Sequence, residues 1–201
     1  MSNIAKEFES RVMLTEKEYL DIVSYYMKLY PDHSFLQNNN YYFDTKDFYL
    51  RKKHITFRIR TINDVRCELT LKIKGEHGDE EINDDITFKE MDTIMKEKFF
   101  PNGNVKKFLL SLPYPLSSYD NIVTLYNRRL EIAQDHHLLV IDKNEYNGIT
   151  DYNLEVETKD DINLARKFLY DYIRKFSLSL ANQKYAGKFH RAIDSVINKT
   201  K

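Results

Sequence analysis

The sequence is poor in the residues that cross-link a chain or give it hinges. One cysteine, Cys67, occurs among 201 residues, which excludes an intrachain disulfide and a CxxC zinc site. Five glycines and four prolines leave no flexible linker, so we expect a single domain over residues 1–201. A chain of this length can bury a sizeable core.

Targeting and membrane signals are also missing. The N-terminus lacks the basic and then apolar stretch of a signal peptide. The longest aliphatic run, residues 138–141, is far too short to cross a bilayer. A single cysteine suits a reducing compartment. We therefore expect a cytoplasmic protein that has no membrane partner.

The net charge is zero, although charged residues make up 31% of the chain. The 31 Lys and Arg residues balance 31 Asp and Glu residues. Proteins that bind nucleic acids or membrane surfaces in general are basic overall, so we expect no nucleic acid as a partner. The phosphate loops GxxxxGKS/T and GxGxxG are absent as well. Any phosphate would therefore be bound by side chains.

What the sequence does contain is a repeated alternation of charged and apolar residues. Successive side chains of a strand point to opposite faces, so Arg58 and Arg60 share one face and Phe57 and Ile59 the other. The same alternation predicts eight strands, at residues 7–11, 40–45, 55–60, 66–74, 80–88, 123–132, 137–143 and 152–158.

The charges on these faces are mostly sorted by sign from strand to strand. Pairs of one sign occur on four strands, as Glu7 with Glu9, Arg58 with Arg60, Lys72 with Lys74, and Glu155 with Glu157. The plain alternative is the wet face of a half-open sheet, which usually mixes Lys and Glu within a strand. The sorting favours an α+β fold with a closed, eight-stranded barrel that is charged inside and apolar outside.

Helical periodicity predicts the cover of this barrel. The first helix, residues 15–30, begins with the capping-box spacing of Thr15 and Glu18. Two short helices follow at residues 89–100 and 104–112, and two more end the chain. On the last helix, Lys188 and Arg191 lie on one cationic ridge. We expect these helices to pack on the outside of the barrel.

A charged interior cannot remain dry and empty, because each unpaired buried charge costs several kcal/mol. Water, metal ions and a polyanion would have to fill it. Oxygen ligands from carboxylates favour Mg²⁺ or Mn²⁺ over zinc. Arg and Lys suit phosphate oxygens. The pattern therefore predicts a metal-bound oligophosphate, the arrangement that stabilises phosphoryl transfer.

The charged segments also resemble those of a known family. Glu7-Phe8-Glu9-Ser10-Arg11 resembles the ExExK signature of the CYTH superfamily, the triphosphate tunnel metalloenzymes. The segments that follow in the family's order are Tyr42-Phe43-Asp44-Thr45, Phe57-Arg58-Ile59-Arg60, Leu69-Thr70-Leu71-Lys72 and Leu154-Glu155-Val156-Glu157. The resemblance covers nearly the whole chain and is greatest to the small stand-alone bacterial members.

The resemblance implies that the barrel is an eight-stranded antiparallel tunnel. It also implies a Mg²⁺- or Mn²⁺-dependent triphosphatase that hydrolyses inorganic triphosphate or nucleoside triphosphates. An adenylate cyclase of class IV type and a non-catalytic sensor of polyphosphate or nucleotide remain alternatives. By the same resemblance, Glu7, Glu9, Glu155 and Glu157 would face the metal. Phosphate contacts would come from Arg58, Arg60, Lys72 and Arg129, and further from Lys74, Lys188 and Arg191. Glu81 and Asp142 would be tunnel acids that support the site or orient a water.

Arg11 departs from the signature, which has Lys at this position. Arg keeps the charge and binds phosphate, but it stays protonated and cannot accept a proton. Two interpretations remain open. Either catalysis is slow or uses another base, or Arg11 grips the phosphate from further away.

Other reactive residues fit structural roles better. His136, His137 and His190 have no third partner at metal spacing, so we expect surface histidines. Cys67 lacks the His-Asn pattern of a thiol enzyme and is expected in the core.

Overall fold

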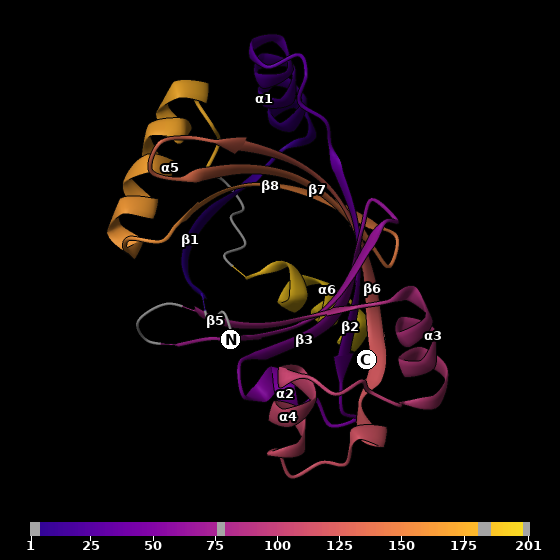
Figure 1. The fold of residues 1–201 in the computed structure, drawn as a ribbon. Helices are drawn as coiled ribbons and strands as arrows, with labels where there is room; N and C mark the ends of the chain where they lie inside the picture. The colour runs from indigo at the N-terminus through magenta and orange to yellow at the C-terminus, as the bar shows by residue number, and fades with distance from the viewer. Residues whose placement is uncertain (1–4, 76–78, 181–185, 199–201) are drawn as a thin grey trace.

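Eight antiparallel strands form one strongly curved sheet around a central space, and most helices lie outside it (Figure 1). The computed structural model describes residues 5–75, 79–180 and 186–198, without the side chains of residues 5–7. The strands are β1 Ala5–Leu14, β2 Leu36–Asp44, β3 Ile55–Ile62, β4 Arg66–Ile73, β5 Asp79–Ile86, β6 Asp120–Ala133, β7 Leu138–Tyr146 and β8 Ile149–Thr158. The helices are α1 Glu16–Leu29, α2 Tyr49–Lys52, α3 Phe88–Glu97, α4 Asn104–Leu110, the 3₁₀ turn η1 Leu116–Ser118, α5 Ile162–Phe176 and α6 Lys188–Ile197.

The strand order is β1-β5-β4-β3-β2-β6-β7-β8, and β1 pairs with both β5 and β8. Its residues 5–7 pair with β5, whereas residues 8–14 pair with β8. In these pairings no described residue of β1 is paired with both β5 and β8. The two edges of the sheet therefore meet along a staggered seam at β1 and not through a continuous ladder. The α+β class and the eight antiparallel strands are confirmed.

The tight turns follow from residues that tolerate positive φ. Asn147 and Gly148 join β7 to β8 with φ of 48° and 77°. Asn63 and Asp64 lie between β3 and β4 with φ of 50° and 54°. Positive φ at two central residues matches the right-handed twist of paired strands. Asn-Gly and Asn-Asp pairs between two strands are typical of such hairpin turns.

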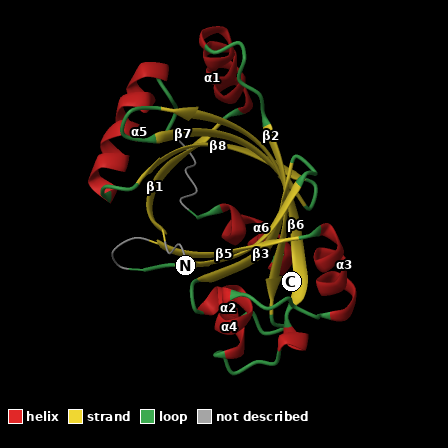
Figure 2. Cartoon of the chain, in the orientation of Figure 1, coloured by secondary structure: helices red, strands yellow, loops and turns green. Residues whose placement is uncertain are grey.

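Helices on the outside cover two apolar clusters of the sheet. One cluster, under α1 and α5, includes Val12, Leu130, Ile141, Leu154 and Val156. The other, under α3 and α4, includes Phe57, Leu69, Leu71, Ile94 and Leu109. Figure 2 shows these helices on two sides of the ring of strands. The predicted apolar outer face is therefore present. Within the described ranges, no helix combines the length and the apolar character needed to traverse a bilayer.

The last helix, α6, was wrongly predicted to lie outside. Figure 1 shows it within the ring of strands. It packs Phe189, Ala192 and Ile193 on Tyr42, Val123, Leu125 and Tyr146. Val123 and Leu125 alternate in step with Arg129, so they belong to the inner face of β6. The inner face is thus apolar at this end, and burying it on α6 removes apolar surface from water.

Asp44 accounts for α2, a helical turn that the sequence did not predict. Its carboxylate is fully buried and accepts hydrogen bonds from the backbone N–H groups of Thr45, Leu50 and Arg51, at 2.7 to 2.9 Å. A side-chain acceptor of this kind satisfies donors that a short helix leaves open. The Tyr42–Thr45 motif therefore ends a strand and starts a helical turn.

Candidate active site

Three carboxylates of β1 and β8 converge at the seam. Glu9 and Glu157 are direct partners in the β1–β8 pairing, and Glu155 lies two residues along the same face. One oxygen from each of the three carboxylates lies within 4.8 Å of the others. The backbone of Glu7 pairs with Asp79, but its side chain lies outside the described part of the chain. Three of the four predicted metal-facing acids are therefore shown to lie together.

The chemistry of these three carboxylates fits a divalent cation. All the donors are oxygen, which hard cations prefer. The side chains of Glu9 and Glu157 are 26% and 20% exposed to solvent, whereas Glu155 is buried. A cation could therefore reach the first two from the solvent side. Glu9, Glu155 and Glu157 are the residues that would hold it.

Cationic side chains already balance this acidic cluster. Arg11 donates to Glu9, and its Nε lies 3.0 Å from Glu155 Oε1. Lys188, the first residue of α6, brings its Nζ to 2.6 Å from Glu155 Oε2. Burial raises the pKa of Glu155, but Lys188 and Arg11 lower it below its ordinary value. The carboxylate is therefore ionised at neutral pH.

Asp142 lies beside this cluster on the inner face of β7 and is completely buried. Arg129 contacts it through Nε at 3.0 Å and Nη2 at 3.1 Å, and Lys188 Nζ lies 2.8 Å from Oδ2. Burial raises the pKa of Asp142, but Arg129 and Lys188 hold it well below its usual range. Its oxygens are thus occupied by donors. Asp142 serves as an ionised counter-ion, which leaves it poorly placed to orient a water.

Arg129 joins the two groups of acids. Besides Asp142, it lies 3.6 Å from Glu155 and 3.7 Å from Glu157. Burial lowers the pKa of Arg129, but Asp142 and Glu157 raise it well above the ordinary value. The guanidinium is therefore a permanent positive charge at the acidic cluster.

A second cationic group lies across the interior on β3 and β4. Burial and the charges of Arg58 and Arg129 lower the pKa of Arg60 to about 10. Arg58 Nε and Thr70 Oγ1, side by side on paired strands, are buried without a hydrogen-bond partner among the described residues. Crowded guanidinium groups and an unused donor are the expected features of a site that awaits an anion.

Lys72 and Glu81 connect the cationic group to the acidic cluster. Lys72 Nζ lies 3.6 Å from Glu9, 3.5 Å from Asp79 and 3.9 Å from Glu81. Burial raises the pKa of Glu81, but Arg58, Lys72 and Arg60 lower it below the ordinary value. Glu81 is therefore an ionised acid close to these cations, as the family resemblance implied.

Two predicted phosphate contacts lie apart from this arrangement. Lys74 follows the last residue of β4 and is exposed. Arg191 is buried, and its guanidinium contacts Asp151 at 2.8 and 3.0 Å and Asn153 at 3.0 Å. Arg191 thus anchors α6 to β8, because the buried pair satisfies both charges.

Buried asparagines are the residues that the sequence reasoning missed. The inner face of the sheet carries Asn38, Asn127, Asn144 and Asn153, all at most 4% exposed. Three of them lie on the same alternation as a predicted charged residue: Asn127 precedes Arg129 by two, Asn144 follows Asp142 by two, and Asn153 precedes Glu155 by two. Extending the alternation by one step along these three strands would have found Asn127, Asn144 and Asn153.

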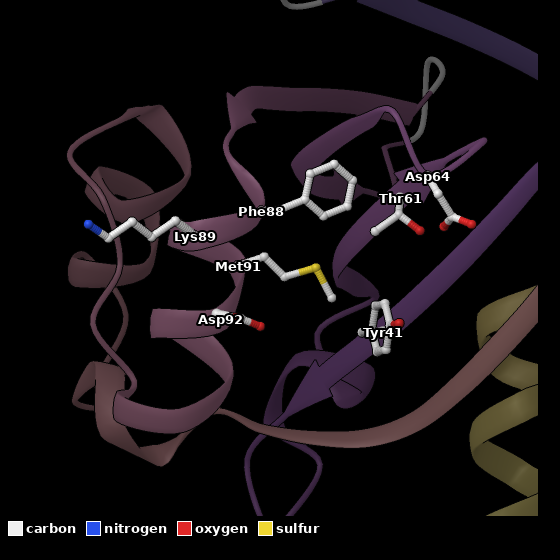
Figure 3. A pocket seen from close by; sticks show the side chains of 7 residues that line it. All are labelled: Tyr41, Thr61, Asp64, Phe88, Lys89, Met91 and Asp92. Atoms are coloured by element: carbon white, nitrogen blue, oxygen red, sulfur yellow. The ribbon is translucent and has the colours of Figure 1, made fainter.

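The cavity in Figure 3 lies elsewhere, on the outer surface between β3 and α3. Its volume is about 540 Å³. The residues around it are Tyr41, Thr61, Asp64, Phe88, Lys89, Met91 and Asp92. None of the predicted site residues lines it, and its charges are of mixed sign. We therefore place the candidate site inside the sheet.

His137 and Cys67 take structural roles. His137 stacks on Phe168 with ring centroids 4.1 Å apart, and its Nε2 lies 2.8 Å from the Tyr172 hydroxyl. It is half-buried and not at the surface as predicted, because α5 covers it. Cys67 is buried, as expected.

Comparisons with known proteins agree with this arrangement. The CYTH domain family matches residues 5–183. A Bacillus subtilis (strain 168) protein named "Putative triphosphatase YjbK" is 31% identical over 156 residues, or 77% of this chain and 78% of that protein. A crystal structure from Bacillus halodurans, described as "a putative adenylate cyclase", has a TM-score of 0.81 and 28% identity over 93% of this chain and 97% of its own. HpAC1 from Hippeastrum has a TM-score of 0.74 at 19% identity, over 94% and 95%, and shows a likeness of fold alone. With the carboxylates of β1 and β8 facing the cations of β3, β4 and β6, the chain belongs to the CYTH family.

Proposed function

We propose that this protein is a metal-dependent triphosphatase that hydrolyses a terminal phosphoanhydride bond of inorganic triphosphate or a nucleoside triphosphate. The observation that carries the proposal is the opposition of two groups inside one sheet. Glu9, Glu155 and Glu157 form an oxygen-only cluster, and Arg58 and Arg60 lie across the interior with an unused donor. The 31% identical relative carries the name of a triphosphatase.

Each group has a distinct role in this proposal. The three carboxylates would hold Mg²⁺ or Mn²⁺, and the ion would polarise the phosphate oxygens and neutralise their charge. Arg58, Arg60 and Lys72 bind the phosphate oxygens, with Arg58 Nε as the free donor. Arg129 adds positive charge between the two groups, where charge develops during phosphoryl transfer.

The attacking water needs an acceptor with a free lone pair. Arg11 cannot accept a proton, and the oxygens of Asp142 are occupied by Arg129, Lys188 and Asn127. Glu81 is ionised, and Lys72 Nζ lies 3.9 Å from its carboxylate. We assign Glu81 the task of orienting the water. Arg11 then acts as a charge-balancing contact of Glu9 and Glu155.

Phosphate release from inorganic triphosphate, ATP and pyrophosphate, each with Mg²⁺, Mn²⁺ or a chelator, tests the proposal. We expect metal-dependent release from triphosphate and none from pyrophosphate. Glu9→Gln should abolish it, since the amide removes a charged ligand. Near-normal rates of phosphate release in this variant would contradict the assignment of a metal-dependent triphosphatase with Glu9 as a ligand. Tight triphosphate binding without turnover under both metals would instead favour a sensor.

An adenylate cyclase is the second candidate, because the 28% identical structure is described as one. In that reaction the ribose 3′-oxygen attacks the α-phosphate in place of water. Chromatography of the products from ATP separates the two activities. A triphosphatase yields ADP and phosphate, and a cyclase yields cyclic AMP and pyrophosphate.

A further inference from the structure

Four buried side chains on β6, β7 and β8 form a closed hydrogen-bonded circuit, which we call the asparagine ring. Its members are Asn127, Asp142, Asn144 and Asn153. Asn127 Nδ2 donates to Asp142 Oδ1 at 2.8 Å and to Asn144 Oδ1 at 3.0 Å. Asn144 Nδ2 donates to Asn153 Oδ1 at 2.8 Å, and Asn153 Nδ2 returns to Asp142 Oδ2 at 3.4 Å. All four are at most 3% exposed.

The strand pairing builds the ring. Asn127 is directly opposite Asn144 in the β6–β7 pairing, and Asp142 is directly opposite Asn153 in the β7–β8 pairing. Side chains opposite each other on one face lie within contact of one another. The ring is therefore a property of the sheet and holds as long as these registers hold.

Asp142 fixes the direction of every hydrogen bond in the ring. An ionised carboxylate only accepts hydrogen bonds, so Asn127 and Asn153 must turn their NH₂ groups toward it. Their oxygens are then free to accept. Asn127 Oδ1 accepts from Asn38 at 3.0 Å, and Asn153 Oδ1 accepts from Arg191 at 3.0 Å as well as from Asn144. No amide in the ring can flip without leaving a buried polar group unpaired, which is costly.

The ring meets the candidate site through Asp142. Its two oxygens accept from the ring on one side, and from Arg129 and Lys188 on the other. Arg129 comes from β6 and Lys188 from α6, and Asp142 is a shared contact that brings these two cations together. Both also contact Glu155, at 3.6 and 2.6 Å.

We propose that Asn127, Asn144 and Asn153 are positioning residues that hold Asp142 so that Arg129 and Lys188 present their charges to the triphosphate. The inference deepens the proposed function and rests on it. The ring acts on phosphate binding more than on the metal ligands, because its own hydrogen bonds end at Asp142, and Glu155 is linked to it through Arg129 and Lys188.

Isothermal titration calorimetry on the full chain tests this separation. Inorganic triphosphate and Mn²⁺ are titrated separately into the wild type, Asn127→Ala and Asn153→Ala. We expect the Kd for triphosphate to rise about tenfold in Asn127→Ala, the effect of one lost hydrogen bond to a charged group. We expect a smaller rise in Asn153→Ala, whose contact is longer. The Kd for Mn²⁺ should change less than about twofold.

Asn39→Ala is the matched control. Asn39 lies on the opposite face of β2 from Asn38, and its amide contacts Thr61 at 3.3 Å. Its triphosphate Kd should equal that of the wild type. Far-UV circular dichroism selects folded variants, and Asn127→Ser, which keeps a small polar group, replaces Asn127→Ala if the latter does not fold.

Wild-type triphosphate affinity in the ring variants would overturn the inference while the proposed function stands. An equal loss of triphosphate and Mn²⁺ affinity would also overturn it, because that pattern marks general loosening. A wild type that binds triphosphate without hydrolysing it overturns the proposed triphosphatase activity. The triphosphate Kd values of the ring variants then still decide whether the asparagine ring positions Asp142. A wild type that binds no triphosphate overturns both.

Discussion

Arg11 and Glu155 are direct partners in the β1–β8 pairing, and Arg11 Nε donates to Glu155 Oε1 at 3.0 Å. The same guanidinium donates to Glu9. Two of the three carboxylates that suit a metal are thus bridged by a cation of the chain itself. A Cβ at Gly187 would lie only 3.1 Å from Arg11 Nη1, so the missing side chain at the start of α6 leaves room for this wide group.

Arg11→Lys should bind metal more tightly than the wild type. An ammonium is a compact point charge and cannot bridge Glu9 and Glu155 as the planar guanidinium does. A carboxylate oxygen is then free for the ion. We expect the Kd for Mn²⁺ to fall by about threefold to tenfold, the effect of one hydrogen bond to a charged group. Calorimetry measures it, and an unchanged or higher Kd would show that Arg11 does not compete with the metal.

Arg129→Ala should strongly reduce the rate of triphosphate hydrolysis, whereas Arg128→Ala should leave it nearly unchanged. Arg129 faces the carboxylates of the interior, and its neighbour Arg128 faces outward over the ring of Phe35, 3.7 Å from its centroid. Losing one preorganised cation at a site of developing charge costs on the order of 100-fold in kcat.

We expect the loss in kcat/KM for triphosphate to be on the order of 100-fold in Arg129→Ala and within about threefold in Arg128→Ala, because exposed charges contribute little. Phosphate-release kinetics measure both. Equal losses in the two variants would argue against an interior site.

The acidic cluster and its cations could be predicted because each side chain of a strand points to one of only two faces of the sheet. Once Glu155 and Glu157 are placed on the face opposite Leu154 and Val156, a polar interior follows, and the structure has this arrangement. The alternation is a local property, so it can be read without the tertiary fold.

The position of α6 could not be predicted in this way. Its apolar stripe requires an apolar partner but does not say which face of the sheet provides it. Val123 and Leu125 lie on the same face of β6 as Arg129, and only the structure shows that this inner face becomes apolar there. Asn127 and Asn144 were overlooked for a related reason, since asparagine signals a turn as often as a buried network.

Removing Arg191 should destabilise the protein more than removing Arg51, although both hold α6 through an Arg–Asp pair. Arg191 pairs with Asp151 with only 3% and 16% of the two side chains exposed. Arg51 pairs with Asp194 at 2.6 Å with 33% and 43% exposed. Breaking a buried pair leaves an uncompensated charge, whereas an exposed pair is screened by water.

We expect the free energy of unfolding to fall by about 3 kcal/mol in Arg191→Ala. In Arg51→Ala the loss should stay below about 1 kcal/mol. Urea denaturation followed by circular dichroism gives both values. Similar losses would mean that α6 is held by its apolar face on Tyr42 and Leu125 and not by the Arg191 anchor.

Stability should decline in acid partly because of Asp142. Burial raises its pKa, but Arg129 and Lys188 lower the folded value below the ordinary 3.8. As the pH falls, the unfolded chain therefore takes up the proton first, and protonation favours unfolding. The stabilisation is fully present above about pH 5 and is lost as the pH falls from there through the folded pKa.

Replacing Asp142 by Asn removes this titration while keeping the size of the side chain. We expect the variant to be less stable than the wild type at pH 7, because Arg129 and Lys188 lose their counter-ion, and the difference to shrink at pH 3. Urea midpoints at pH 7, 5, 4 and 3 measure it for both proteins. A difference that stays constant over this range would show that the pKa of Asp142 is the same in the folded and unfolded states, so that Arg129 and Lys188 do not lower it.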